Sequence, residues 1–122
     1  MIVTFKGDDG TLKSRQLGIE GIHFASFVRC GLAEQDISRQ ILRSLTAPGA
    51  LIAEAVDSES LADMHHKFGI ALKECRESFY WIDILRVAKS MDDVSVQKVE
   101  QLLHEVTAML VASRKTLKQR MK

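Results

Sequence analysis

Turn-forming residues are scarce in this chain of 122 residues. There is one proline, and five of the seven glycines lie within the first 31 positions. From Leu32 onward, the only residues of these two types are Pro48, Gly49 and Gly69. Because proline and glycine are the strongest local breakers of regular structure, their scarcity predicts long elements with few turns. Helices are the elements that commonly run long, so the sequence predicts an all-α protein.

Other features that the chain lacks exclude several classes of protein. Its two cysteines, Cys30 and Cys75, lie 45 residues apart and match no metal-binding or redox spacing. The net charge of +1 is too small for the whole chain to act as a polycation. The longest stretch without a charge, residues 44–53, is about half as long as a bilayer span. With no signal peptide visible at its start, we expect a reduced cytoplasmic protein that does not enter a membrane.

Apolar residues recur at helical spacing in four segments, with approximate ranges of 13–30, 33–56, 60–89 and 92–119. Gly31 is expected to stop the first helix. Ser60 is expected to cap the third, with Asp63 in the reciprocal capping position. Four helices with short connections favour an up-down-up-down bundle over residues 13–122, preceded by a short extension at residues 1–12.

The second helix contains Pro48, which has no backbone donor and collides with the preceding turn. We therefore expect a kink or a break near Ala47. The expected core positions of the first two helices are Leu17, Phe24, Phe27, Val28, Ile37, Ile41, Leu45, Ile52 and Val56. The third and fourth helices each have one apolar face that is expected to pack in the core, which we call the seam. The seam residues are Leu61, Met64, Phe68, Leu72, Cys75, Phe79, Ile82, Val96, Val99, Leu103, Val106, Leu110 and Leu117.

A second apolar stripe lies on the third helix, away from its seam, and includes Ile70, Trp81, Ile84 and Val87. One apolar face per helix suffices for a bundle, so the surplus would form an exposed patch on a monomer. We expect Ile70, Trp81 and Ile84 to lie in a subunit interface. Stacking of unpaired bases on Trp81 is the less favoured alternative, because aromatic side chains dominate buried contacts.

Two blocks of sequence resemble a known family. One is Gln40-Ile-Leu-Arg43-Ser44, followed by Gly49-Ala50 and Ile52-Ala53-Glu54-Ala55. The other is Ile70-Ala-Leu-Lys73-Glu74-Cys-Arg76-Glu77-Ser-Phe-Tyr80-Trp81, preceded by Ser60-Leu-Ala-Asp63-Met. Together they are similar to the four-helix-bundle proteins of the 23S rRNA intervening-sequence family. The chain departs from that pattern at Ala47-Pro48 and at Leu51.

The resemblance implies a bacterial helical bundle that assembles as a ring-shaped homopentamer, with no established biochemical role. It also implies a relation to the accessory variability proteins of diversity-generating retroelements. Those proteins form similar pentamers that bind nucleic acid and a reverse transcriptase.

Glutamates on facing helices raise the question of a metal site. Di-metal sites in bundles need two Glu-x-x-His motifs, and this sequence contains none. We therefore expect a structural ion-pair network formed by Arg43, Glu54, Lys73, Glu74 and Glu77, and neither a metal nor another cofactor. No acid–base or nucleophile arrangement is visible either, so no catalytic residue is assigned and an enzyme is not expected.

The end of the chain is basic, and its candidate nucleic-acid contacts are Arg114, Lys115, Lys118 and Arg120. Two structural alternatives remain open. Cations in the last turn of a helix interact favourably with its dipole. The acidic turn between the second and third helices, which contains Glu54, Asp57, Glu59 and Asp63, could also neutralise them.

The sequence thus predicts a non-enzymatic homo-oligomeric bundle that acts as a nucleic-acid-associated accessory protein on RNA or DNA. The alternative is an assembly or adaptor module that binds another protein, such as a reverse transcriptase, without nucleic acid.

Overall fold

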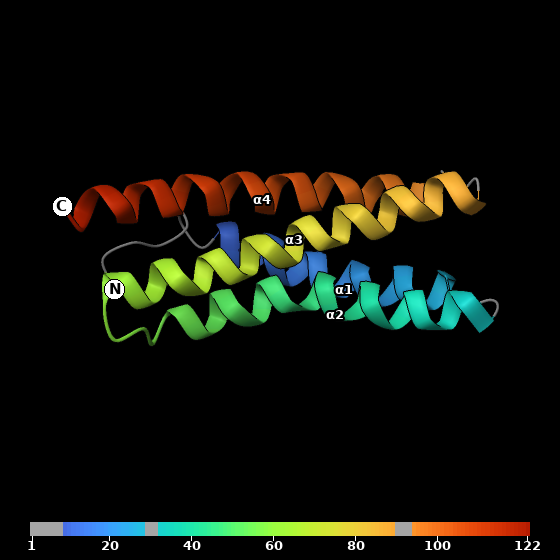
Figure 1. Ribbon diagram of the computed structural model, residues 1–122, viewed down its shortest axis with the longest axis horizontal. Coiled ribbons are helices and arrows are strands. Elements are labelled where there is room, and N and C mark those ends of the chain that lie inside the picture. The colour runs from blue at the N-terminus through green and yellow to red at the C-terminus, as the bar shows by residue number, and fades with distance from the viewer. Residues whose placement is uncertain (1–8, 29–31, 90–93) are drawn as a thin grey trace.

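A computed structural model describes residues 9–28, 32–89 and 94–122, and within these ranges every regular element is a helix. The helices are α1 (Asp9–Val28), α2 (Leu32–Ala55), α3 (Leu61–Lys89) and α4 (Val94–Arg120). Consecutive helices run in opposite directions and pack side by side (Figure 1). Helix α4 returns to contact α1, so each helix touches its two neighbours around a central core. The prediction of an all-α fold with four helices is confirmed.

The helix boundaries agree with the sequence patterns to within a few residues, except at the start of α1. This helix begins at Asp9, four residues before the expected start. Gly10, which the sequence places in the extension before the bundle, is buried within the helix. Packing therefore overrides the weak helix propensity of glycine at this position. Residues 1–8 and Cys30, Gly31, Asp92 and Asp93 lie outside the described residues, so the predicted helix stop at Gly31 falls there too.

The core between the four helices contains most of the expected apolar side chains, including Leu17, Leu45, Leu103 and Leu110. Two expectations are wrong. Phe27 is 44% exposed, because the neighbouring Val28 is the residue that faces the core. Val56 is 62% exposed, because α2 ends at Ala55 and Val56 lies in the following turn.

Helix α3 begins with the predicted cap. The Ser60 hydroxyl accepts the N–H of Asp63 at 3.0 Å. The Asp63 carboxylate in turn accepts the N–H of Glu59 at 3.2 Å. In the usual capping box that second bond goes to the N-cap residue itself, so here it is displaced by one residue.

Helix α2 runs through Pro48 without interruption, so the predicted break is wrong, and a kink at this position stays a prediction. Pro48 is buried between two residues of the core, Leu45 and Ile52. Packing on both sides of the proline holds the two halves of the helix together. Pro48 has no N–H to donate to the carbonyl of Ser44, so the helix continues without that hydrogen bond.

Helices α1 and α2 approach each other closely where glycines face the partner helix. A methyl group at Gly21 would lie 2.8 Å from Cβ of Leu45, and one at Gly49 would lie 3.1 Å from the carbonyl oxygen of Ser14. At Gly18 the nearest atom, Cα of Thr46, would be 3.9 Å away, which is an ordinary contact. Gly21 and Gly49 therefore allow the two backbones to pack closely.

This contact predicts opposite effects for two similar substitutions. Gly21→Ala should lower the free energy of unfolding by about 1–3 kcal/mol, because Leu45 Cβ cannot move without its backbone. Gly18→Ala should raise it by up to about 1 kcal/mol, through helix propensity alone. Urea denaturation followed by circular dichroism measures both. Equal effects of the two substitutions would contradict the close approach at Gly21.

Candidate functional site

Helix α3 presents different polar side chains to its two neighbours. Glu74 and Glu77 point toward α2, where they contact a basic residue. His65 and Arg76 line a cavity together with residues of α4. The two sets lie on different sides of α3 because residues three or four apart share a helix face.

On the α2 side, Arg43 is the centre of an ion-pair network. Its guanidinium donates to both carboxylate oxygens of Glu74, at 3.0 and 2.6 Å, and also to Glu77. Glu77 accepts a further hydrogen bond from the indole N–H of Trp81 at 3.0 Å. Arg43 is about half exposed, and exposed ion pairs contribute only about 0–1 kcal/mol to stability. The network therefore contributes more to geometry than to stability.

Two further members were expected in this network, Glu54 and Lys73, and the structure does not bring them to it. Glu54 lies exposed in the last turn of α2, and Lys73 lines the opposite flank of α3. Within the described part of the chain, neither forms an ion pair. Arg43, Glu74 and Glu77 are thus the predicted members that meet.

The described residues contain no group of three or more His, Cys, Asp or Glu side chains able to hold a metal ion. Cys75 is buried, and this burial raises the pKa of its thiol to about 11. Very little thiolate exists at neutral pH with such a pKa, which is the opposite of what a nucleophilic cysteine requires. None of the described helices is long and apolar enough to cross a bilayer.

Between α3 and α4 lie two adjoining cavities of about 210 and 340 Å³, which we call the α3–α4 groove. Both cavities are lined by His65, Leu72, Arg76 and Arg114. The remaining lining residues are His66, Gly69, Ile70, Lys73, Val111, Lys115 and Lys118. Of these eleven residues, five are lysine or arginine, two are histidine and none is acidic. The groove is therefore strongly cationic although the whole chain is nearly neutral.

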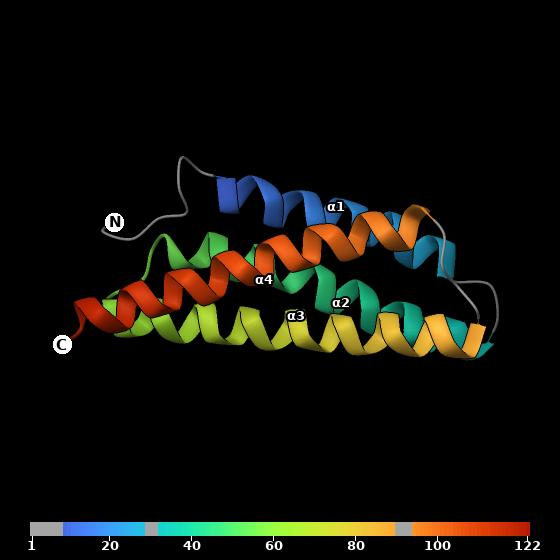
Figure 2. The ribbon, with the colours of Figure 1, turned by 90° about the horizontal axis from the view of Figure 1, so that it is seen from above.

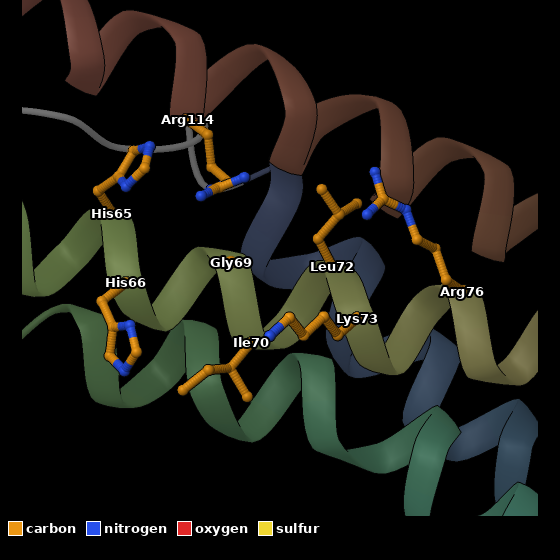
Figure 3. A pocket seen from close by; sticks show the side chains of 8 residues that line it. All are labelled: His65, His66, Gly69, Ile70, Leu72, Lys73, Arg76 and Arg114. Carbon is orange, nitrogen blue, oxygen red and sulfur yellow. The ribbon is translucent and has the colours of Figure 1, made fainter.

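Figure 3 shows how the two arginines enter the groove from opposite walls. Arg114 extends from α4 toward α3, Arg76 extends from α3 toward α4, and Leu72 lies between them. The guanidinium of Arg114 rests against the backbone of α3, where a methyl group at Gly69 would lie only 3.2 Å from Nη2. A larger residue at position 69 would displace this guanidinium.

The Nε of Arg114 is buried and has no hydrogen-bond partner within the described part of the chain. A buried charged donor without an acceptor costs about 1–3 kcal/mol or more. Burial and the nearby charges of Arg114, Lys118 and His66 also lower the pKa of His65. The groove therefore concentrates positive charges that repel one another.

The acidic turn between α2 and α3 does not pair with the groove. Its Asp63 carboxylate binds Lys67 at 3.0 Å, and that hydrogen bond is the main reason that the pKa of Asp63 is lowered. Among the described residues, no carboxylate forms an ion pair with Arg114, Lys115 or Lys118. Of the four predicted nucleic-acid contacts, these three line the groove, and Arg120 is exposed at the end of α4.

The predicted interface residues follow the outer side of α3. Ile70 lies at the edge of the groove and is 36% exposed, whereas Trp81 and Ile84 are half-buried. Trp81 also packs against the core and joins the Arg43 network through Glu77. The single chain thus leaves part of this stripe accessible to a partner.

Sequence reasoning missed His65, Gly69 and Arg76 as members of the groove. In an antiparallel helix pair, residues near the start of one helix face residues near the end of the other. His65 lies near Lys118, and Gly69 lies against Arg114. The spacing of His65, Gly69 and Arg76 along one face of α3 is the signal that could have identified them.

Comparisons with known proteins extend the resemblance seen in the sequence. The family model for 23S rRNA-intervening sequence proteins matches residues 12–112. A similar solved structure is the crystal structure of a protein of unknown function from the S23 ribosomal protein family of Bacteroides thetaiotaomicron VPI-5482. The two are 30% identical with a TM-score of 0.75, and the match covers 84% of this chain and 95% of that one.

No curated protein sequence matches the chain. The relation to the retroelement accessory proteins stays a prediction. Because the family model spans most of the sequence, this chain belongs to the family of 23S rRNA-intervening sequence proteins.

Proposed function

We propose that this chain is a non-enzymatic, homo-oligomeric accessory protein of the bacterial cytoplasm that binds RNA or DNA through the α3–α4 groove and the adjoining end of α4. The observation that supports binding is the concentration of unpaired positive charge in the groove, with no acidic residue among its lining side chains. Lysine and arginine side chains that neutralise phosphates release counterions, and this release drives sequence-independent binding to nucleic acid.

The same geometry favours a sequence-tolerant mode of binding. The basic side chains come from two packed helices, and the described fold contains neither a sheet platform nor a helix projecting from the bundle. Such surfaces contact the phosphate backbone, whereas specificity requires contacts to base edges. We therefore propose little discrimination among sequences.

Assembly would multiply the effect of the groove. We propose a ring of identical subunits, with Ile70, Trp81 and Ile84 in the subunit contact. The family resemblance implies that this ring is a homopentamer. Heterologous contacts close into rings when the rotation between subunits permits it. A ring would place one copy of the groove on every subunit around the same rim.

Assembly predicts a solution mass of about five times the subunit mass of 13.7 kDa. Multi-angle light scattering after size exclusion measures it. Ile84→Glu should shift the protein toward the subunit mass, because a desolvated carboxylate in a contact costs several kcal/mol. Val94→Glu is the matched control, since Val94 is exposed outside the stripe and its substitution should leave the mass unchanged. A wild-type protein that runs only at 13.7 kDa would contradict the proposed assembly.

Nucleic-acid binding predicts a steep dependence on salt. The logarithm of affinity should fall with the logarithm of salt concentration by about 0.7–0.9 for each phosphate neutralised. Fluorescence anisotropy with a labelled RNA at several salt concentrations measures this slope. Removing four basic side chains of the site should make the slope shallower and weaken binding, in the variant Arg114, Lys115, Lys118, Arg120→Ala.

A second variant tests whether RNA affinity depends on this site or only on the total positive charge of the chain. It also removes four positive charges, but from α1, α2 and the start of α4, in Lys13, Arg15, Arg39, Lys98→Ala. This control should retain most of the affinity and slope of the wild type. If both variants bind RNA equally, or if the wild type does not bind even at low salt, the proposed site is wrong. The adaptor function, with a protein partner such as a reverse transcriptase, would then take its place.

A further inference from the structure

We propose that the α3–α4 groove is a built binding site for a single phosphate group, held between Arg114 of α4 and Arg76 of α3. This inference deepens the proposed function, because it names the chemical group and the pocket through which a polynucleotide would be anchored. It differs from general attraction to a basic surface in requiring a defined cavity and a positioned guanidinium.

The position of Arg114 is the first argument. Its guanidinium rests on the backbone at Gly69, the one position of α3 that has no side chain. Contact with a rigid helix restricts the rotamers of the arginine and orients its donors before any ligand arrives. Arginine presents a planar fork of N–H donors that matches the oxygen atoms of phosphate. Its Nε is buried against α3, so the donors that Arg114 offers to an anion in the groove are the remaining N–H groups of the guanidinium.

The composition of the cavity is the second argument. Arg76 approaches from the opposite wall (Figure 3). Lys115 and Lys118 line the wider part of the groove. The two cavities, of about 210 and 340 Å³, are at or below the lower end of the range of about 300–1,000 Å³ for small-molecule sites. Either cavity has room for a phosphate group, and it is the cationic lining that favours an anion as the ligand.

The test uses inorganic phosphate at constant ionic strength, followed by the chemical shifts of backbone amides in the whole protein. Phosphate should shift the amides of residues 65–76 and 111–118 in a saturable manner. Arg114→Gln should weaken binding about tenfold, which corresponds to the loss of one strong charge-assisted hydrogen bond. No saturable shift in the wild type would overturn the proposal.

Substitutions at Gly69 test the cavity without changing any charge. Gly69→Leu places a side chain where the Arg114 guanidinium rests, and should weaken phosphate binding by a similar factor. Gly69→Ala, whose methyl group would lie 3.2 Å from Nη2, is a milder variant that should give a smaller loss. The matched control is Ala88→Leu, which adds the same side chain at the exposed far end of α3. Unchanged phosphate affinity in Gly69→Leu and Gly69→Ala would show that the positioned guanidinium is not required, and would overturn the proposal.

Oligonucleotides separate this inference from the proposed function. Two RNAs of one sequence, one with a 5′-phosphate and one with a 5′-hydroxyl, are titrated into wild type and Gly69→Leu. Tighter binding of the 5′-phosphate form that Gly69→Leu abolishes supports a terminal phosphate as the ligand. Equal binding of both RNAs, weakened equally by Gly69→Leu, supports a backbone phosphate. If Gly69→Leu leaves RNA binding unchanged, the proposed function stands and the phosphate site is overturned. If the protein binds phosphate but not RNA, the phosphate site stands and the proposed function is overturned.

His65 gives the site a dependence on pH. Burial lowers its pKa, and so do the charges of Arg114 and Lys118 of α4, with which it lines the groove. The charge of His66 on the same helix lowers that pKa less, and no described group of α2 contributes to the shift. These positive groups and burial lower the pKa of His65 in the free protein, whereas a bound dianion would raise that pKa. Anion binding should therefore take up a proton, and affinity should rise as pH falls through the histidine range.

Sulfate is the probe for this effect, because it keeps its charge across that range. Its affinity should rise several-fold between pH 7.5 and 5.5 in wild type and in the control His23→Gln, whose histidine is exposed on α1. His65→Gln should remove most of the rise. An equal rise in His65→Gln would show that His65 does not contact the anion.

Discussion

Two buried hydroxyl groups constrain how α2 lies on α3, and much of the molecule depends on that register. The Ser78 hydroxyl donates to Oγ of Ser44 at 2.8 Å, and Ser44 donates to the carbonyl of Ile41. A slide of one helix along the other would break the bond between the two hydroxyls, and each would keep only the carbonyl of its own helix, as Ser78 does with Glu74 at 3.1 Å. Arg43 adds a bridge to Glu74 and Glu77 beside them, at the surface. The two sequence blocks that resemble the family are thus the two sides of one contact.

This register determines which side of α3 is left for α4. Once Glu74 and Ser78 face α2, the helical repeat turns Gly69, Leu72 and Arg76 toward the fourth helix. The seam residues Leu103 and Leu110 then hold α4 against the core. At the other end of this helix pair, Arg86 of α3 pairs with Glu100 of α4 at 2.9 Å. The basic side chains that line the groove have no such acidic partner among the described residues of the opposite helix, so a cationic groove follows from the same packing that stabilises the bundle. Figure 2 shows α4 crossing obliquely, with its end over α3 and its start near α1.

The sequence predicted the parts of this structure that depend on periodicity. The seam of α4, the cap at Ser60 and the pairing of Arg43 with α3 are local or repeat at helical spacing, and the structure contains them. It failed where tertiary contact overrides a local preference, as at Gly10 and at the uninterrupted Pro48. It also could not identify Gly21 and Gly69 as contact points, because the space beside a glycine is set by a distant segment. The groove required both helices in register, whereas the sequence indicated only its α4 half.

Within the last ten residues of the chain, 113–122, only Leu117 is buried. A segment attached by so little apolar surface opens locally far more often than the whole bundle unfolds, and its amide protons exchange early. A ligand that bridges the two walls of the groove binds only while the end of α4 is packed against α3. At about a hundred times its dissociation constant it would oppose that opening by about 2.7 kcal/mol. Ligand binding in the groove and local ordering of the end of α4 are thus thermodynamically coupled, without any rearrangement of the core.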